Sequence, residues 1–89
     1  MIRREVLIRN RLGLHARAAA RFVHAASRFR SRITAGRDGR SIDGKSILGI
    51  LLLAASQGTL IELSADGPDE EEAVEALAAL VEDGFGEGA

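Results

Sequence analysis

The chain of 89 residues contains no cysteine, no tryptophan and no tyrosine, and it has a single proline. Without cysteine there can be no disulfide, no thiol catalysis and no cysteine-ligated metal site. The N-terminus lacks the apolar stretch of a signal peptide, and no apolar run approaches the length that crosses a membrane. We therefore expect a cytoplasmic protein that does not insert into membranes, uses no cofactor or metal, and is a monomer by default.

Basic residues are absent from the second half of the chain. The first 45 residues hold all 12 lysines and arginines with only 3 acidic residues, whereas the remainder holds 10 acidic residues and no basic one. A basic surface favours an anionic partner, such as nucleic acid, a membrane, phosphate or an acidic protein. Only three phenylalanines are available for base stacking, which argues against nucleic acid. An RNA-binding domain stays open as an alternative, and it would show an RNA affinity that falls steeply with salt.

The hydrophobic pattern predicts seven elements in the order β-α-β-β-α-β-α. Alternating residues predict strands at 3–9, 31–36, 40–43 and 59–66, and helical spacing predicts helices at 16–29, 46–53 and 68–83. The segment 46–53 is also compatible with an apolar strand, but Ser46 as an N-cap favours a helix. Asp38-Gly39 predicts a hairpin turn, because both central residues of that turn need a positive φ. The fold class is α+β, with three helices covering one face of a mainly antiparallel sheet.

The same pattern predicts which side chains face the core. They are Val6, Ile8, Ala19, Phe22, Ala26, Phe29, Ile61, Leu63 and Ala65. Asp66 or Asp69 is expected to cap the last helix, which carries acidic residues in its first turn and ends before Gly84. We expect residues 1–89 to form one domain in which 84–89 are a frayed tail.

The segment GRSIDGKS, residues 39–46, matches the phosphate-binding loop pattern G-x-x-x-x-G-K-[ST]. Ser41, Ile42 and Asp43 alternate as a strand, whereas a phosphate-binding loop must be irregular for its N–H groups to converge. A fold of that kind also needs a parallel sheet with several crossover helices, and too little chain follows Ser46 to build one. A nucleotide-binding protein is therefore the alternative from another class, and in it substitution of Lys45 would abolish nucleotide binding.

The segment NRLGLHARAAARF, residues 10–22, places a histidine where a loop becomes a helix. If Ala16 is the first helical residue, His15 occupies the N-cap position, where Ser, Thr, Asp or Asn is normally preferred. A lone histidine is most often an exposed or satisfied residue. A local rule broken in this way, however, tends to mark a functional position.

That position suits phosphate chemistry. The N–H groups of Ala16, Arg17 and Ala18, together with the partial positive charge of the helix end, stabilise an anion. The positive end also favours the neutral, nucleophilic imidazole of His15, and Arg17 offers a planar fork of donors to phosphate oxygens. These features predict that His15 accepts a phosphoryl group and passes it on. His24 falls on the opposite side of the helix, and we expect it to be a surface residue.

The segment GLHARAA, followed by DGKSILGILLLAASQGTLIELSADGPDEEEAVEALAALV, resembles the HPr family, the histidine phosphocarriers of the bacterial phosphoenolpyruvate-dependent phosphotransferase system. The resemblance covers about residues 2–83 and implies an open-faced β-sandwich of four antiparallel strands and three helices. It also implies that His15 takes phosphate on Nδ1 from Enzyme I and hands it to an EIIA domain, with Arg17 assisting. The family usually has proline where this chain has Ala18, from which we expect slightly altered stability and unchanged function.

The resemblance extends to Ser46. The segment KSILGI is similar to the one recognised by HPr kinase/phosphorylase, which implies regulatory phosphorylation of Ser46, although serine is also simply a good N-cap. A phosphate at a helix N-terminus is not expected to unfold the domain, so its effect would act through partners. An alternative within the family is a nitrogen-type or purely regulatory relay that serves no sugar transporter.

The predicted helix 46–53 is apolar nearly all round. From the residues alone it is either a buried core helix or a helix with an exposed apolar face. The resemblance implies a docking patch beside His15, formed by Leu14, Ala20, Arg21, Lys45, Ile47, Leu48 and Leu51. Arg11, Arg17, Arg21 and Lys45 are expected to form its basic rim, with the acidic last helix on the other side of the domain.

Overall fold

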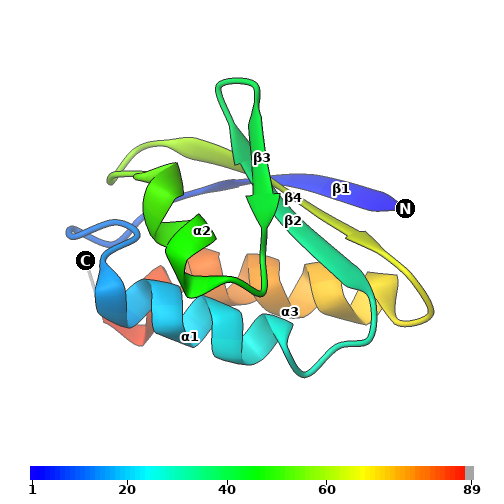
Figure 1. Ribbon diagram of the computed structural model, residues 1–89. Helices are drawn as coiled ribbons and strands as arrows, with labels where there is room; N and C mark the ends of the chain where they lie inside the picture. The colour runs from blue at the N-terminus through cyan, green and yellow to red at the C-terminus, as the bar shows by residue number, and fades with distance from the viewer. Residues whose placement is uncertain (88–89) are drawn as a thin grey trace.

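The computed structural model describes residues 1–87, which form a four-stranded sheet with helices on one face (Figure 1). The elements in chain order are β1 (Ile2–Leu7), α1 (Ala16–Ala26), β2 (Arg32–Arg37), β3 (Arg40–Asp43), α2 (Ile47–Leu53), β4 (Leu60–Asp66), α3 (Glu70–Glu82) and the 3-10 helix η1 (Gly84–Gly86). This order confirms the predicted α+β class, and the predicted ends shift by a few residues. The segment 46–53 is a helix, as the N-cap serine indicated.

The sheet has the strand order β1-β4-β2-β3, and every neighbouring pair is antiparallel. The central strand β4 pairs Ile61 with Val6 of β1 and Ala65 with Ile33 of β2. At the β2–β3 hairpin, Asp38 and Gly39 both have positive φ, at 51° and 77°, which confirms the predicted turn. The antiparallel sheet thus leaves one face for the helices and one for solvent.

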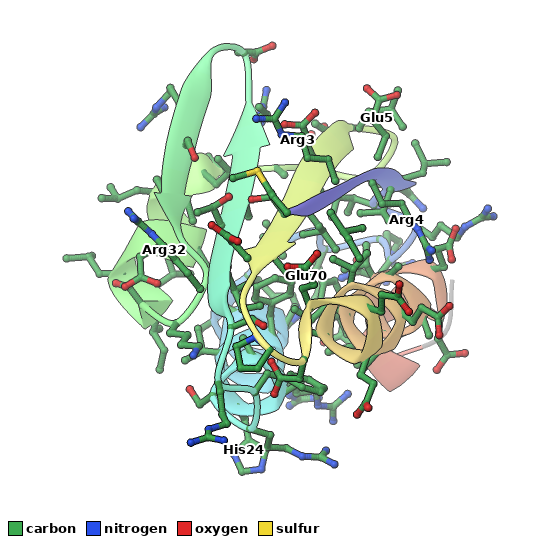
Figure 2. The ribbon with its side chains drawn as sticks, turned by 90° about the vertical axis from the view of Figure 1, so that its right-hand side faces the viewer. Arg3, Arg4, Glu5, His24, Arg32 and Glu70 are labelled. Atoms are coloured by element: carbon green, nitrogen blue, oxygen red, sulfur yellow. The ribbon has the colours of Figure 1, made fainter. Side chains whose placement is uncertain are left out.

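The helices form a single layer in which α1 lies between α2 and α3 and contacts both (Figure 1). The other face of the sheet is open and polar. Figure 2 shows Arg3 and Glu5 on the side away from the helices, and His24 on the outer surface of α1, where it was expected. The acidic helix α3 packs on β1 and β4. Because α1 contacts α2 on one side and α3 on the other, it separates these two helices.

The core between the two layers contains the predicted residues with one change. Val6, Ile8, Ala19, Phe22, Ala26, Ile61, Leu63 and Ala65 are all buried. Phe29 is only partly buried, because α1 ends at Ala26 and the residues after it form turns. The helix stripe was therefore predicted correctly up to the point where the helix stops.

The predicted cap at the start of α3 is confirmed in its position at Asp69 but not in its hydrogen bonding. Asp69 is the N-cap residue, but its side chain makes no hydrogen bond to the helix; it accepts bonds from Arg30 N, Ser31 N and Ser31 Oγ across the loop after α1. The Asp66 carboxylate lies near the amino group of Met1, at 3.8 Å. The Asp69 side chain thus ties the start of α3 to the loop after α1, and neither carboxylate bonds to the N–H groups of the helix.

The predicted frayed tail is also wrong for residues 84–87. Phe85 is only 1% exposed and belongs to the core, and η1 follows α3 after one residue, Asp83. Glu87 N donates to Gly84 O at 3.0 Å, which keeps the segment folded. An aromatic ring buried in this way anchors the chain that carries it. Residues 88–89 lie outside the described part of the chain.

Candidate functional site

His15 is the N-cap of α1, as predicted, and its ring replaces the usual capping oxygen. Its backbone is extended, with φ −76° and ψ 178°, and its Nδ1 accepts a hydrogen bond from Arg17 N at 3.3 Å. Its carbonyl oxygen accepts the first intrahelical bond, from Ala19 N at 2.8 Å. The ring nitrogen therefore does what a Ser or Asp oxygen does at other N-caps. Because Nδ1 accepts a hydrogen bond from a backbone N–H, the unshared electron pair of this nitrogen faces the helix end.

The loop before α1 holds the histidine in place. Gly13 has φ +64° and lies against the segment that follows α2, so closely that a Cβ there would come within 2.5 Å of Ala55 O. Leu14 N donates to the same carbonyl oxygen at 2.9 Å. The buried Asn10 side chain donates to Gly13 O at 2.7 Å. Glycine is thus needed at position 13 for close packing as well as for backbone conformation.

His15 lines a hollow of about 700 Å³ at the N-terminal end of α1. The residues around it are Arg11, Leu12, His15, Ala16, Arg17, Arg21, Gly86 and Glu87. The structure thus brings together the histidine and three of the four predicted rim residues. Three guanidinium groups beside a helix N-terminus make this hollow a favourable place for an anion such as phosphate.

Glu87 is the residue that sequence reasoning missed. Its Oε2 lies 2.6 Å from His15 Nε2, and its Oε1 accepts a hydrogen bond from Asn10 Nδ2 at 3.1 Å. Burial raises the pKa of Glu87, but hydrogen bonds from His15 and Asn10, together with the electrostatic effect of His15 and Arg21, outweigh burial and lower it. The carboxylate is therefore ionised at neutral pH. No periodicity or motif links Glu87 to a histidine so far away in the chain.

Lys45 and Ser46 lie apart from this hollow. Lys45 Nζ donates to Phe29 O at 2.7 Å, beyond the C-terminal end of α1, so Lys45 does not line the hollow around His15, and its place on the rim of the docking patch stays a prediction. Ser46 is the N-cap of α2, and its side-chain oxygen accepts a bond from Gly49 N at 3.1 Å. In the phosphate-loop match, residues 40–43 form β3 and pair with β2, so their backbone does not converge on a ligand.

The helix α2 presents an apolar surface, which settles the choice that the sequence left open. Only Ile50 and Leu53 of this helix are buried, whereas Ile47, Leu48, Leu51 and Leu52 are exposed. Leu12 is also exposed and lines the His15 hollow. Of the other predicted docking residues, Ala20 and Arg21 are exposed, but Leu14 is 5% exposed and packs in the core. Its side chain therefore offers almost no surface to a partner.

Two further features are absent from the part of the chain that the structure describes. Residues 1–87 hold no cluster of three His, Cys, Asp or Glu side chains with the spacing of metal ligands. None of the helices in this range has both the length and the apolar character needed to cross a bilayer.

Comparisons with known proteins agree with the geometry of the site. Residues 2–83 match the family model described as PTS HPr component phosphorylation site. The phosphocarrier protein HPr of Cupriavidus necator is 49% identical, with 99% of each chain covered. The crystal structure of HPr-C-His from Thermoanaerobacter tengcongensis is 48% identical in sequence, with a TM-score of 0.96 and full coverage of both chains. The crystal structure of an HPr dimer from the same organism is 51% identical, with a TM-score of 0.78, and the match covers 92% of this chain and 94% of that chain. The chain therefore belongs to the HPr family, the phosphocarrier proteins of the phosphotransferase system.

Proposed function

We propose that the protein carries phosphoryl groups on Nδ1 of His15, accepting them from Enzyme I of the phosphotransferase system and passing them to an EIIA domain. The observation that carries this proposal is the position of Nδ1. It caps α1, faces Arg17 N at 3.3 Å, and lies in a hollow lined by Arg11, Arg17 and Arg21. A nucleophilic nitrogen at a positive helix end is suited to receive an anionic group.

The residues around His15 then have defined tasks. Once Nδ1 is bonded to phosphorus it no longer accepts the Arg17 N–H, and a phosphate oxygen takes over as acceptor. The N–H groups of Ala16 and Ala18 belong to the same helix end and strengthen the field on the anion. The Arg17 guanidinium supplies two donors in one plane, which match two phosphate oxygens. These groups spread the charge of the phosphoryl group during transfer.

We infer that Enzyme I and EIIA dock on the apolar surface of α2 next to the hollow. The exposed residues Ile47, Leu48 and Leu51 form this surface, and the loop that bears His15 is bonded to Ala55, just beyond α2. Apolar patches rimmed by charge are typical of transient docking sites. The arginines of the hollow favour partners with acidic residues around their own active sites.

We propose a regulatory role for Ser46, through phosphorylation by HPr kinase/phosphorylase. Its oxygen lies at the start of α2, so a phosphate there would add about two negative charges beside the docking surface. Like charges across an interface lower the affinity for an acidic partner. Incubation with the kinase and ATP is expected to add one phosphate to the wild type and none to Ser46→Ala.

The test of the carrier function is phosphorylation by Enzyme I and phosphoenolpyruvate, followed by intact-mass spectrometry. The wild type and the control His24→Ala are expected to gain one acid-labile phosphate, and His15→Ala none. Transfer to an EIIA domain would then be read as loss of that phosphate. A wild type that takes up no phosphate from a competent Enzyme I would refute the proposal. Light scattering of the same samples tests the predicted monomer against the dimer known for a relative.

A further inference from the structure

The segment after α3 folds back over the N-terminal end of α1. Gly84, Phe85 and Gly86 all have positive φ, at 64°, 58° and 75°, and they reverse the direction of the chain. The buried Phe85 ring anchors this reversal, and its carbonyl oxygen accepts a hydrogen bond from Arg21 Nη1. Glu87 is therefore held against the site, because both the η1 segment before it and the start of α1 that it contacts are folded.

The Glu87 carboxylate is held at both oxygens. Oε2 contacts His15 Nε2 at 2.6 Å, and Oε1 accepts from Asn10 Nδ2 at 3.1 Å, while the same amide donates to Gly13 O at 2.7 Å. The side chains of His15 and Glu87 are 28% and 14% exposed, so water reaches the pair only partly. A short, partly shielded contact of this kind fixes the orientation of both groups.

The two nitrogens of the His15 ring have different neighbours, and these define the tautomer. Nδ1 accepts from Arg17 N, so in the neutral ring the proton lies on Nε2, where Glu87 accepts it. The partner of one ring nitrogen commonly sets the state of the other. The ring is thus arranged with an unprotonated Nδ1 whose electron pair faces the helix end, and with Nε2 protonated and in contact with Glu87.

From this geometry we propose that Glu87 is a positioning residue for the phosphorylation of His15, an inference that rests on the carrier function proposed above. It holds the proton on Nε2 and directs the incoming phosphoryl group to Nδ1. The Nδ1 electron pair forms the bond to phosphorus, and the pair of the broken bond returns to the leaving atom of the donor. The Nε2 proton stays in place, and the positive charge that the ring acquires is opposed by the Glu87 carboxylate.

The remaining charges around the ring make this carboxylate necessary. Arg11, Arg17 and Arg21 line the same hollow, and all three disfavour a cationic ring. Glu87 is the carboxylate that faces the ring among the residues lining the hollow. It touches the edge of the imidazole at Nε2, whereas the phosphoryl group bonds to Nδ1, so both fit at once. A tail that merely covered the site would have to leave before transfer, and its removal would speed the reaction.

The experiment uses phosphoramidate, a small phosphoryl donor, so that the result does not depend on Enzyme I. Nitrogen-15 NMR of the ring identifies which nitrogen of His15 is phosphorylated in the wild type, Glu87→Ala and Glu87→Gln. Glu82→Gln serves as the matched control, because Glu82 is an exposed carboxylate at the end of α3. His24 of the same molecule reports on an exposed histidine that has no Glu87 beside it.

We expect the wild type and Glu82→Gln to form the Nδ1 product at His15, and Glu87→Ala to form both isomers. Glu87→Gln keeps an acceptor oxygen for the Nε2 proton and should still form the Nδ1 product. Because it lacks the negative charge, its rate of phosphorylation at His15 should be lower than that of the wild type by a factor on the order of ten. The isomers formed at His24 should be the same in every variant. An unchanged isomer ratio in Glu87→Ala, or a faster reaction in either variant, would overturn the proposal. If the carrier function itself were wrong, the wild type would take up no phosphate from Enzyme I, while the isomers formed with phosphoramidate would still be those expected above.

Discussion

Replacement of Phe85 by alanine tests whether the segment after α3 is an integral part of the core. The ring is 1% exposed, in a cluster that also contains Phe22, Leu77 and Val81. Truncation of a buried phenylalanine to alanine costs about 3–5 kcal/mol, including the cavity that remains. The short η1 segment can move inward to fill part of that cavity, so we expect about 3 kcal/mol, at the low end of the range. For a domain of this size, that loss lowers the Tm by roughly 12–24 °C.

Urea unfolding followed by circular dichroism measures this loss directly. The matched control is Leu52→Ala, because Leu52 is a large apolar side chain that is 55% exposed, and its truncation is expected to change the free energy of unfolding by less than about 0.5 kcal/mol. The Phe85→Ala protein should also lose the contact between Glu87 and His15, which the nitrogen-15 spectrum of the ring reports. A Phe85→Ala protein as stable as the Leu52→Ala control would show that the segment adds nothing to the core.

Three further predictions concern the loops and helix ends. The hydrogen bond from Ser31 Oγ, followed by those from backbone N–H groups, lowers the pKa of Asp69 from 3.8 to about 2. The stabilising effect of the ionised Asp69 carboxylate is therefore complete above pH 3.8 and disappears as the pH falls through 2. The urea midpoint of Asp69→Asn should depend less on pH in that window than the midpoint of the wild type. Ser46→Ala removes the N-cap of α2 and should cost about 1 kcal/mol in urea unfolding, whereas Ser46→Asp keeps a capping oxygen and most of the stability. Ala54, exposed and in the left-handed region at φ 52°, should give about 1 kcal/mol of added stability when replaced by glycine, seen as a higher urea midpoint.

The elements and their order were predictable because local signals agreed with one another. Asp38-Gly39 requires a tight turn, Ser46 starts a helix, and the alternation of residues 60–66 matches a strand with one buried face. The N-cap position of His15 followed from the same kind of local reading. Such signals act over a few consecutive residues, so the sequence reveals them before any tertiary structure is known.

The contacts that were missed all join segments far apart in the chain. Asp69 satisfies the N–H groups of Arg30 and Ser31 because two loops meet at the same end of the helix layer. Glu87 reaches His15 because Phe85 is buried in the core where η1 contacts α1 and α3, a tertiary contact that no local pattern describes. A glycine-rich segment reads as flexible from composition, since glycine permits many conformations. Here a single buried ring selects one of them.

The choice of histidine as the N-cap of α1 has a consequence for the proposed reaction. In the resting protein Nδ1 accepts the Arg17 N–H, so the helix end is satisfied and the nucleophile is oriented by the same hydrogen bond. When His15 carries the proposed phosphoryl group, an oxygen of that group would replace the ring nitrogen as acceptor of the same N–H. The helix therefore remains capped in both states, and neither direction of transfer has to disrupt the start of α1. Serine or aspartate would also cap the helix, but neither has the second nitrogen of an imidazole ring, whose proton Glu87 holds in the proposed mechanism.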